Sequence, residues 1–234
     1  MLHHFIEIDS MTRRTTLRSE KEKTITFSNV LLALTITLCI ICFAVTLVLN
    51  FRLLYYFDID YLNIPQRSGL SVAEIKANYD ALISYNSIFF NGMLEFPTLA
   101  MSETGRIHFA EVKQIFVGMQ ILLGVTFVLG VGGALYKCRK QEMGYLKLSA
   151  IFTLGLPAVL GALVALNWEK VFVTFHEIFF KNDYWVFSAK TDPVITILPD
   201  TFFMHCAILI FLLVALGSLL CFSSYKKGIK KNLR

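Results

Sequence analysis

Charged residues and cysteine are both scarce in this sequence. Asp, Glu, Lys and Arg make up 17% of the 234 residues, whereas hydrophobic residues make up 56%, and the mean hydropathy is +0.61. So apolar a composition excludes an ordinary soluble domain and indicates an integral membrane protein. The five cysteines fall in apolar segments or in a short basic link. The other loops therefore offer neither a disulfide nor a thiolate cluster for a metal.

Several enzyme signatures are also missing. The sequence contains no GxSxG elbow, no Walker loop and no Rossmann glycine pattern, and the segment His176–Phe180 lacks the second histidine of an HExxH zinc motif. A zinc site built from scattered histidines stays open as an alternative. The net charge of +5 is better explained by an anionic inner leaflet than by nucleic acid.

Four apolar stretches are each long enough to cross a bilayer, which takes about 20 residues. They cover residues 27–50, 115–136, 145–167 and 201–223. Charged side chains are missing from their interiors. This argues against ion transport, because intramembrane carboxylates would mark such a pathway.

Lys and Arg gather in three of the segments that flank these stretches. The segments are an N-terminal arm (1–26), a link (137–144) and a C-terminal tail (224–234). The positive-inside rule places all three in the cytoplasm, so 51–114 and 168–200 face outward. We therefore expect a mainly α membrane protein of four transmembrane helices, with both termini inside and the two outer segments forming a cap.

The outer segments predict a small α/β cap. Ser71 and Glu74 have the spacing of a capping box, which starts a short helix. Residues 87–96 surround an Asn-Gly pair and predict a hairpin, and two further strands are expected within 184–198. Residues 52–64 alternate aromatic and acidic side chains, as in an interfacial strand or an aromatic belt. These pieces are too small to hold a core, so they should rest on the helix bundle.

Two histidines lie at matching positions beside apolar stretches. His108 precedes the second stretch by about 10 Å of helix, and His176 follows the third. Ser102 or Thr104 can cap the helix that carries His108, and Glu111 shares its face. Each histidine taken alone is explained by an ordinary structural role at the membrane boundary. Two at one depth fit proton transfer, because imidazole titrates near neutrality.

The other aromatic and histidine residues admit both a structural and a functional interpretation. Phe, Tyr and Trp around the two histidines are typical of a membrane boundary, while the functional interpretation is a pocket for acyl chains. His205 lies four residues into the fourth stretch. It is interpreted as a core histidine that is hydrogen-bonded across the bundle.

Residues and short motifs spread along the chain carry a family resemblance. They are Asn78-Tyr79, Pro97, Ser102, His108–Lys113, Phe175–Phe180, Asn182-Asp183, Trp185, Asp192-Pro193 and Leu198-Pro199. In this order, and within the four-span frame, they resemble the lipoprotein intramolecular transacylases of low-GC Gram-positive bacteria.

The resemblance implies an extracellular cap and two catalytic histidines, His108 and His176, in a protein of the bacterial cytoplasmic membrane. The implied reaction moves the sn-2 acyl chain of a diacylglyceryl-modified N-terminal cysteine onto the α-amino group of that cysteine, which gives a lyso-form lipoprotein. It needs no cofactor and no external acyl donor. One histidine would act as base and the other as acid, with His176 preferred as base.

The expected partners are diacylated bacterial lipoproteins as substrate and the surrounding membrane lipids, with the active site at the extracellular face. The residues expected to contact the substrate are Ser102, Phe175, Phe179, Asn182, Asp183, Trp185 and Phe202. Two alternatives stay open. One is a non-catalytic membrane accessory or sensor protein whose cap binds a partner, and the other is a metal-dependent membrane hydrolase.

Overall fold

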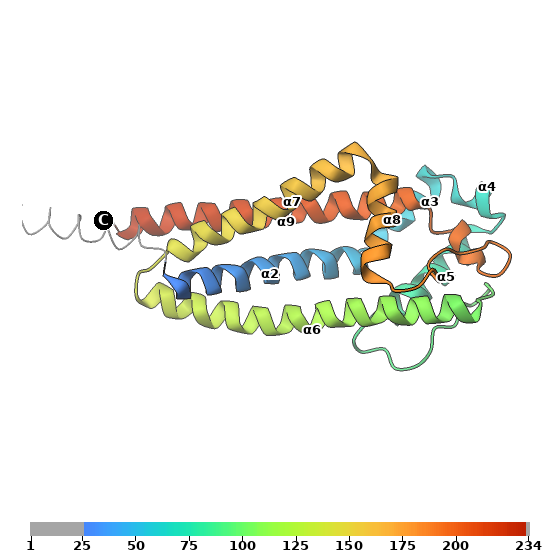
Figure 1. Cartoon of the computed structure of the whole chain (residues 1–234), viewed down its shortest axis with the longest axis horizontal. Helices are drawn as coiled ribbons and strands as arrows, with labels where there is room; N and C mark the ends of the chain where they lie inside the picture. The colour runs from blue at the N-terminus through green and yellow to red at the C-terminus, as the bar shows by residue number, and fades with distance from the viewer. Residues whose placement is uncertain (1–25, 233–234) are drawn as a thin grey trace, which may run out of the picture.

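The computed structural model describes residues 26–232, and long helices set its long axis (Figure 1). These helices are α2 (Phe27–Asn50), α6 (Glu103–Arg139), α7 (Gly144–Leu166) and α9 (Asp200–Asn232). The α2 helix packs against the other three. The predicted N-terminal arm, apart from Thr26, lies outside the described residues.

Small and hydroxyl-bearing residues join these helices where their surfaces are apolar. The Thr37 and Thr153 hydroxyls lie 3.1 Å apart between α2 and α7, and the Ser218 hydroxyl of α9 donates to the Ala150 carbonyl at 2.8 Å. Gly133 of α6 faces Leu32 of α2 so closely that an added Cβ would lie 2.6 Å from a leucine methyl. Such contacts hold helices together where both sides are apolar.

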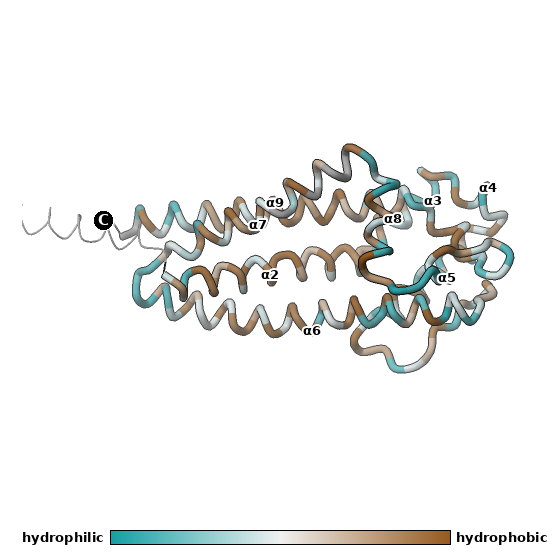
Figure 2. The backbone as a smooth tube through the Cα atoms, in the orientation of Figure 1, coloured by the Kyte–Doolittle hydropathy of each residue, from teal (hydrophilic) through white to brown (hydrophobic). Residues whose placement is uncertain are grey.

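Apolar residues cover the long helices, and hydrophilic residues gather at the two ends of the molecule (Figure 2). Within residues 26–232, the helices α2, α6 and α9 are long and apolar enough to cross a membrane, whereas Gly144–Val159 of α7 is a shorter apolar helix. The 37 residues of α6 measure about 55 Å. Since a bilayer core is about 30 Å thick, this helix extends well beyond it.

The segments beyond one end of the bundle form a helical cap. Its elements are α3 (Arg52–Tyr61), α4 (Ile64–Ser68), α5 (Val72–Tyr85), α8 (Trp168–Phe179) and the 3-10 turn η1 (Pro193–Thr196). The rings of Tyr55 and Tyr79 stack at 3.7 Å, and the Tyr55 hydroxyl donates to the Ile197 carbonyl at 2.7 Å. Their buried cluster includes Phe109 of α6 and Phe202 of α9. The expectation that the cap rests on the bundle is therefore confirmed.

The predicted strands of the cap are wrong, because residues 26–232 contain helices, turns and loops and no strand. Residues 52–61 form α3 because Tyr55, Asp58 and Ile59 lie at helical spacing and are buried together on one face. The alternation of aromatic and acidic residues does not follow this face, because Asp58 is buried and Asp60 is exposed. The capping box of Ser71 and Glu74 is confirmed at the start of α5.

The predicted hairpin at 87–96 is a loop that lies along α6. The Lys113 ammonium donates to the Phe90 carbonyl at 2.9 Å, and the Gln120 side chain accepts from the Ile88 amide at 3.1 Å. These side chains of α6 satisfy backbone groups that a hairpin would have paired with each other. The two strands expected within 184–198 are replaced by turns and η1, whose amides bond to carbonyls two to four residues earlier.

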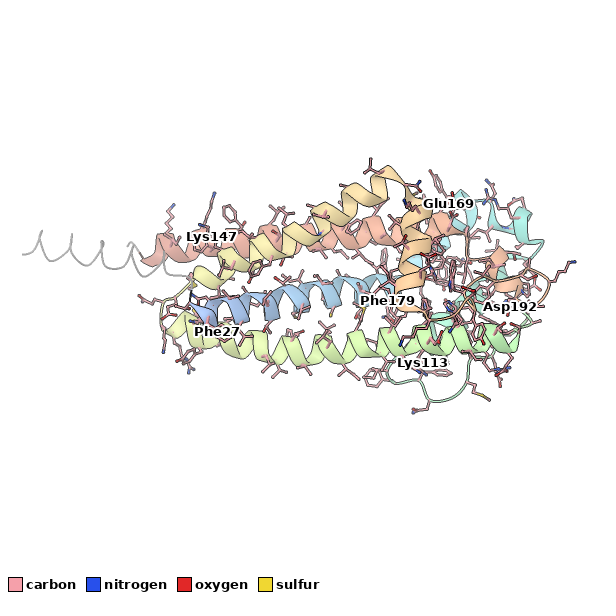
Figure 3. All side chains as sticks on the ribbon, viewed as in Figure 1. Phe27, Lys113, Lys147, Glu169, Phe179 and Asp192 are labelled. Carbon is pink, nitrogen blue, oxygen red and sulfur yellow. The ribbon has the colours of Figure 1, made fainter. Side chains whose placement is uncertain are left out.

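Asp192 fastens the loop before η1 to the start of α6 (Figure 3). The residue is 2% exposed, and its carboxylate accepts from the Ser102 amide at 2.8 Å and from the Thr191 hydroxyl at 2.7 Å. Gly105 lies directly beside this carboxylate, where an added side chain would collide with it. The negative charge at a helix N-terminus is also favourable.

Replacing Asp192 should loosen this junction. We expect Asp192→Ala to lower the free energy of unfolding by about 1–3 kcal/mol, because it leaves the half-buried Ser102 amide without its partner. Thermal unfolding in detergent micelles measures the effect. Asp60→Ala is the matched control, since Asp60 is exposed on α3. Equal stability of the two variants would contradict the assigned role of Asp192.

Candidate active site

The α8 helix lies across the direction of the long helices (Figure 1). It begins after Asn167, whose side chain accepts from the Lys170 amide at 2.9 Å as an N-cap. It ends where the Phe180 amide donates to the His176 carbonyl at 2.8 Å. The labels of Phe179 and Lys113 in Figure 3 show this end of α8 next to α6. A residue near the end of α8 is thereby brought to the first turns of α6.

The histidines of α6 and α8 meet at this junction. The ring centroids of His108 and His176 lie 6.1 Å apart. Phe180 contacts both rings, with centroids 4.7 Å from His108 and 5.6 Å from His176. The geometry therefore brings together the two histidines that the sequence placed at one depth.

A backbone hydrogen bond fixes the orientation of His176. Its Nδ1 lies 2.7 Å from the Phe172 carbonyl, and a carbonyl can only accept, so Nδ1 carries the proton in the neutral ring. The indole of Trp185 stacks on the other side at 4.7 Å. Burial lowers the pKa of His176, and the bond to Phe172 opposes this shift. The neutral ring therefore keeps its lone pair at Nε2.

His108 lies deeper among aromatic rings, in the part of α6 that precedes the apolar stretch 115–136. It is 5% exposed, and the edge of the Phe187 ring approaches it at 5.4 Å. Burial, and secondarily the nearby His176, lower the pKa of His108 to about 4. Its Nδ1 is buried without a hydrogen-bond partner. At pH 7 the imidazole of His108 is accordingly neutral.

Glu111 follows His108 by one turn but bonds elsewhere. One of its carboxylate oxygens, Oε1, accepts from the Asn182 amide at 3.0 Å, while Oε2 is buried without a hydrogen-bond partner. Asn182 also accepts from the Tyr184 amide at 3.1 Å. The pair ties the turn that carries Trp185 to the helix that carries His108.

Three further residues predicted to contact the substrate surround the exposed side of His176. The rings of Phe175 and Trp185 lie 5.4 Å and 4.7 Å from it. Phe179 packs on Phe175 at 4.6 Å and is 53% exposed. With Asn182 near His108, these residues border the histidine pair, and their contact with substrate stays a prediction.

The other predicted substrate residues have contacts of their own. Ser102 caps α6, as expected, by accepting from the Gly105 amide at 3.0 Å. Its place six residues before His108 corresponds to about 9 Å along the helix. Phe202 packs in the cap core against Tyr55 at 5.0 Å. Asp183 is exposed at the turn after α8, and its backbone carbonyl accepts from the Val186 amide.

The third histidine of the outer end has a partner of its own. The His205 Nδ1 lies 2.9 Å from the carboxylate of Asp58, which is fully buried. The expected hydrogen bond of His205 is confirmed. Its partner, however, belongs to the cap helix α3 and the His205 side chain is 23% exposed, so the histidine is bonded to the cap and is not a core residue bonded across the bundle. Among residues 26–232, no three His, Cys, Asp or Glu side chains are grouped as metal ligands would be.

The sequence matches the family model of the lipoprotein intramolecular transacylase Lit over residues 30–203. It is also 42% identical to the solved lipoprotein intramolecular transacylase Lit of Bacillus cereus, with a TM-score of 0.86, covering 88% of this chain and 95% of that one. This chain belongs to the lipoprotein intramolecular transacylase family.

Two further solved structures of the Bacillus cereus transacylase each carry a single substituted histidine. The histidine is replaced by arginine in one and by alanine in the other. Both are 39% identical to this chain with a TM-score of 0.81, and both cover 94% of it. The alignments cover 97% and 98% of those structures. A comparison with curated protein sequences finds no match.

Several residues that contact the histidine pair could not be assigned a role from the sequence. Phe180 contacts both histidines, Phe187 covers His108, and Phe172 fixes the ring of His176. Phe172 could have been found, since it precedes His176 by one helical turn. Phe180 could also have been found, since it follows His176 by four residues at the end of α8. Phe187 lies outside regular helices, where spacing carries no such signal.

The buried histidine of this transacylase should make its stability depend on pH. Below the ordinary histidine pKa of about 6.5 the unfolded chain gains a proton, whereas folded His108 resists protonation down to about 4. Stability should therefore be lost as the pH falls through this range. We expect His108→Gln to show a smaller loss of melting temperature between pH 7 and pH 4.5 than the wild type. An unchanged slope would contradict the neutral, buried state of His108.

Proposed function

We propose that this chain is an intramolecular acyltransferase that acts on diacylated bacterial lipoproteins. It would move the sn-2 acyl chain of the diacylglyceryl group to the α-amino group of the same cysteine and release a lyso-form lipoprotein. Family membership supports the class of reaction. The observation that carries the mechanism is the pair of neutral, aromatic-enclosed histidines, whose rings lie 6.1 Å apart.

His176 fits the role of general base. Because its Nδ1 proton is committed to the Phe172 carbonyl, its Nε2 lone pair is free to accept a proton. The amine nitrogen would attack the ester carbonyl, forming the new N–C bond while Nε2 takes the amine proton. A base whose pKa lies near or below neutrality is unprotonated and ready at the working pH.

His108 fits the role of hydrogen-bond donor and acid. A neutral imidazole carries one N–H, which could stabilise the negative charge that develops on the ester oxygen. When the ester C–O bond breaks, the glyceryl oxygen takes up a proton, and the proton removed from the amine balances it. Donor and acceptor belong to one molecule, so no other reactant is consumed.

The remaining difficulty is to bring the amine and the ester of a flexible lipid together. The partly exposed rings of Phe175, Phe179 and Trp185 offer an apolar surface beside His176 against which the acyl chains can pack. Asn182 borders the same place through its bond to Glu111. Confinement between α8 and α6 would then position the headgroup.

The proposed topology places this site at the extracellular face of the cytoplasmic membrane. The α7 helix, with 23 residues, packs between α2 and α9 and would supply the fourth crossing. The basic segment 137–144 and the described part of the basic tail, 224–232, lie at the end of the bundle opposite the cap, which supports cytoplasmic termini.

Removing either histidine tests the mechanism. We expect His108→Ala and His176→Ala each to lower lyso-form production by about 100-fold or more, since general acid or base catalysis contributes 10²–10⁴-fold. Mass spectrometry of a co-expressed lipoprotein measures whether its N-terminal amine is acylated.

Glu177→Ala is the matched control, because Glu177 is exposed on α8 next to His176. Near-normal activity of either histidine variant would refute the two-histidine mechanism. A lipoprotein left unacylated by the wild type would favour a partner-binding membrane protein instead. Activity that is lost with a chelator and restored by zinc would favour a metal-dependent hydrolase.

A further inference from the structure

Glu111 carries a carboxylate oxygen that the protein leaves unpaired. Its Oε2 is buried without a hydrogen-bond partner, while Oε1 is held by the Asn182 amide at 3.0 Å. No Lys, Arg or His nitrogen within the described residues forms an ion pair with it. A buried carboxylate oxygen without a donor is costly, so this arrangement favours binding of a cationic donor.

The cations near Glu111 in the sequence are engaged elsewhere. The Lys113 ammonium donates to the Phe90 carbonyl at 2.9 Å and lies over the Tyr85 ring at 4.3 Å. Arg106 pairs with Glu103 at 3.5 Å. Neither cation is therefore free to pair with Glu111.

Glu111 lies on α6 close to the histidine pair. Glu111 follows His108 by three positions on α6, so the two side chains are neighbours on one helix face. Asn182, which holds the other oxygen, comes two residues after Phe180, whose ring contacts both histidines. Glu111 thus reaches the junction from α6, and Asn182 reaches it from the turn after α8.

We infer that Glu111 Oε2 binds the α-ammonium group of the substrate's N-terminal cysteine. This inference rests on the proposed function and names how the nucleophile is held. A primary ammonium has three N–H donors, so one can bond to Oε2 while another faces the histidine base. The base first takes one proton from the ammonium and passes it to solvent. The neutral amine, still hydrogen-bonded to Glu111, then attacks from a fixed position, and the base takes the second proton as the N–C bond forms. Asn182 acts as the positioning residue for the carboxylate.

The test compares two synthetic diacylglyceryl-cysteine lipopeptides, one with a free α-amine and one with an acetylated α-amine. Their affinities are measured by displacement of a fluorescent lipopeptide from the full chain in detergent. The wild type should prefer the free amine. Glu111→Gln keeps an oxygen for Asn182 but removes the charge, so it should weaken binding of the free amine by about 10-fold or more. Its affinity for the acetylated peptide should stay unchanged.

Matched variants separate charge recognition from a structural effect. Glu177→Gln removes an exposed carboxylate of α8 and should keep the full preference. Glu111→Asp keeps the charge and should retain part of it, and Asn182→Ala should reduce it because the carboxylate is no longer held in place. Equal affinity of the wild type for both peptides would overturn the inference without any variant. A preference unchanged in Glu111→Gln would overturn it too.

The two proposals fail in different ways. If the wild type makes lyso-form lipoprotein but does not distinguish the two peptides, only the role of Glu111 is wrong. If the wild type prefers the free amine but makes no lyso-form product, the proposed reaction is wrong while the ammonium site stands.

Discussion

The contact between the end of α8 and the first turns of α6 is the interaction on which the site depends. No residue of α8 is fully buried, and the helix contacts the long helices through half-buried side chains such as Phe172, whose ring lies 5.7 Å from that of Phe203 on α9. The end of α8 is held by the stack of Trp185 on His176, by Phe180 against His108, and by the bond from Asn182 to Glu111. The contacts that position the end of α8 are therefore also the contacts that assemble the site. A change that weakens them would displace both the helix end and the site residues.

Burial at this junction determines the protonation state of both histidines. The aromatic rings that exclude water lower the pKa of both imidazoles, because a charge is poorly solvated there. At neutral pH each ring has one N–H and one lone pair. The hydrogen bond to Phe172 assigns these in His176. Under the proposed function the same rings would also offer an apolar surface to acyl chains, so that lipid binding and the lowered pKa values would have one physical cause.

Features that depend on local spacing could be predicted from the sequence, and those that depend on distant contacts could not. The caps at Ser71 and Ser102 and the shared depth of His108 and His176 follow from short motifs and from helical rise. The hairpin predicted around Asn91 and Gly92 was wrong because Lys113 and Gln120 of α6 bind the backbone of this segment. The bond from Asn182 to Glu111 joins residues far apart in the chain, and no spacing rule relates them.

The continuity of α6 connects the site to the membrane. One unbroken helix carries His108, Glu111 and the apolar stretch from Ile115 onward, so the rise per residue fixes His108 at about 10 Å above that stretch. A lipid-anchored cysteine would have to lift its ester by that distance. The side chains of Phe175, Ile178 and Phe179 are exposed on α8. They would shield the acyl chain from water while its ester is raised to His108. Under the proposed function, α6 determines how far above the apolar stretch the reaction takes place. The exposed apolar side chains of α8 would allow a lipid to reach that position.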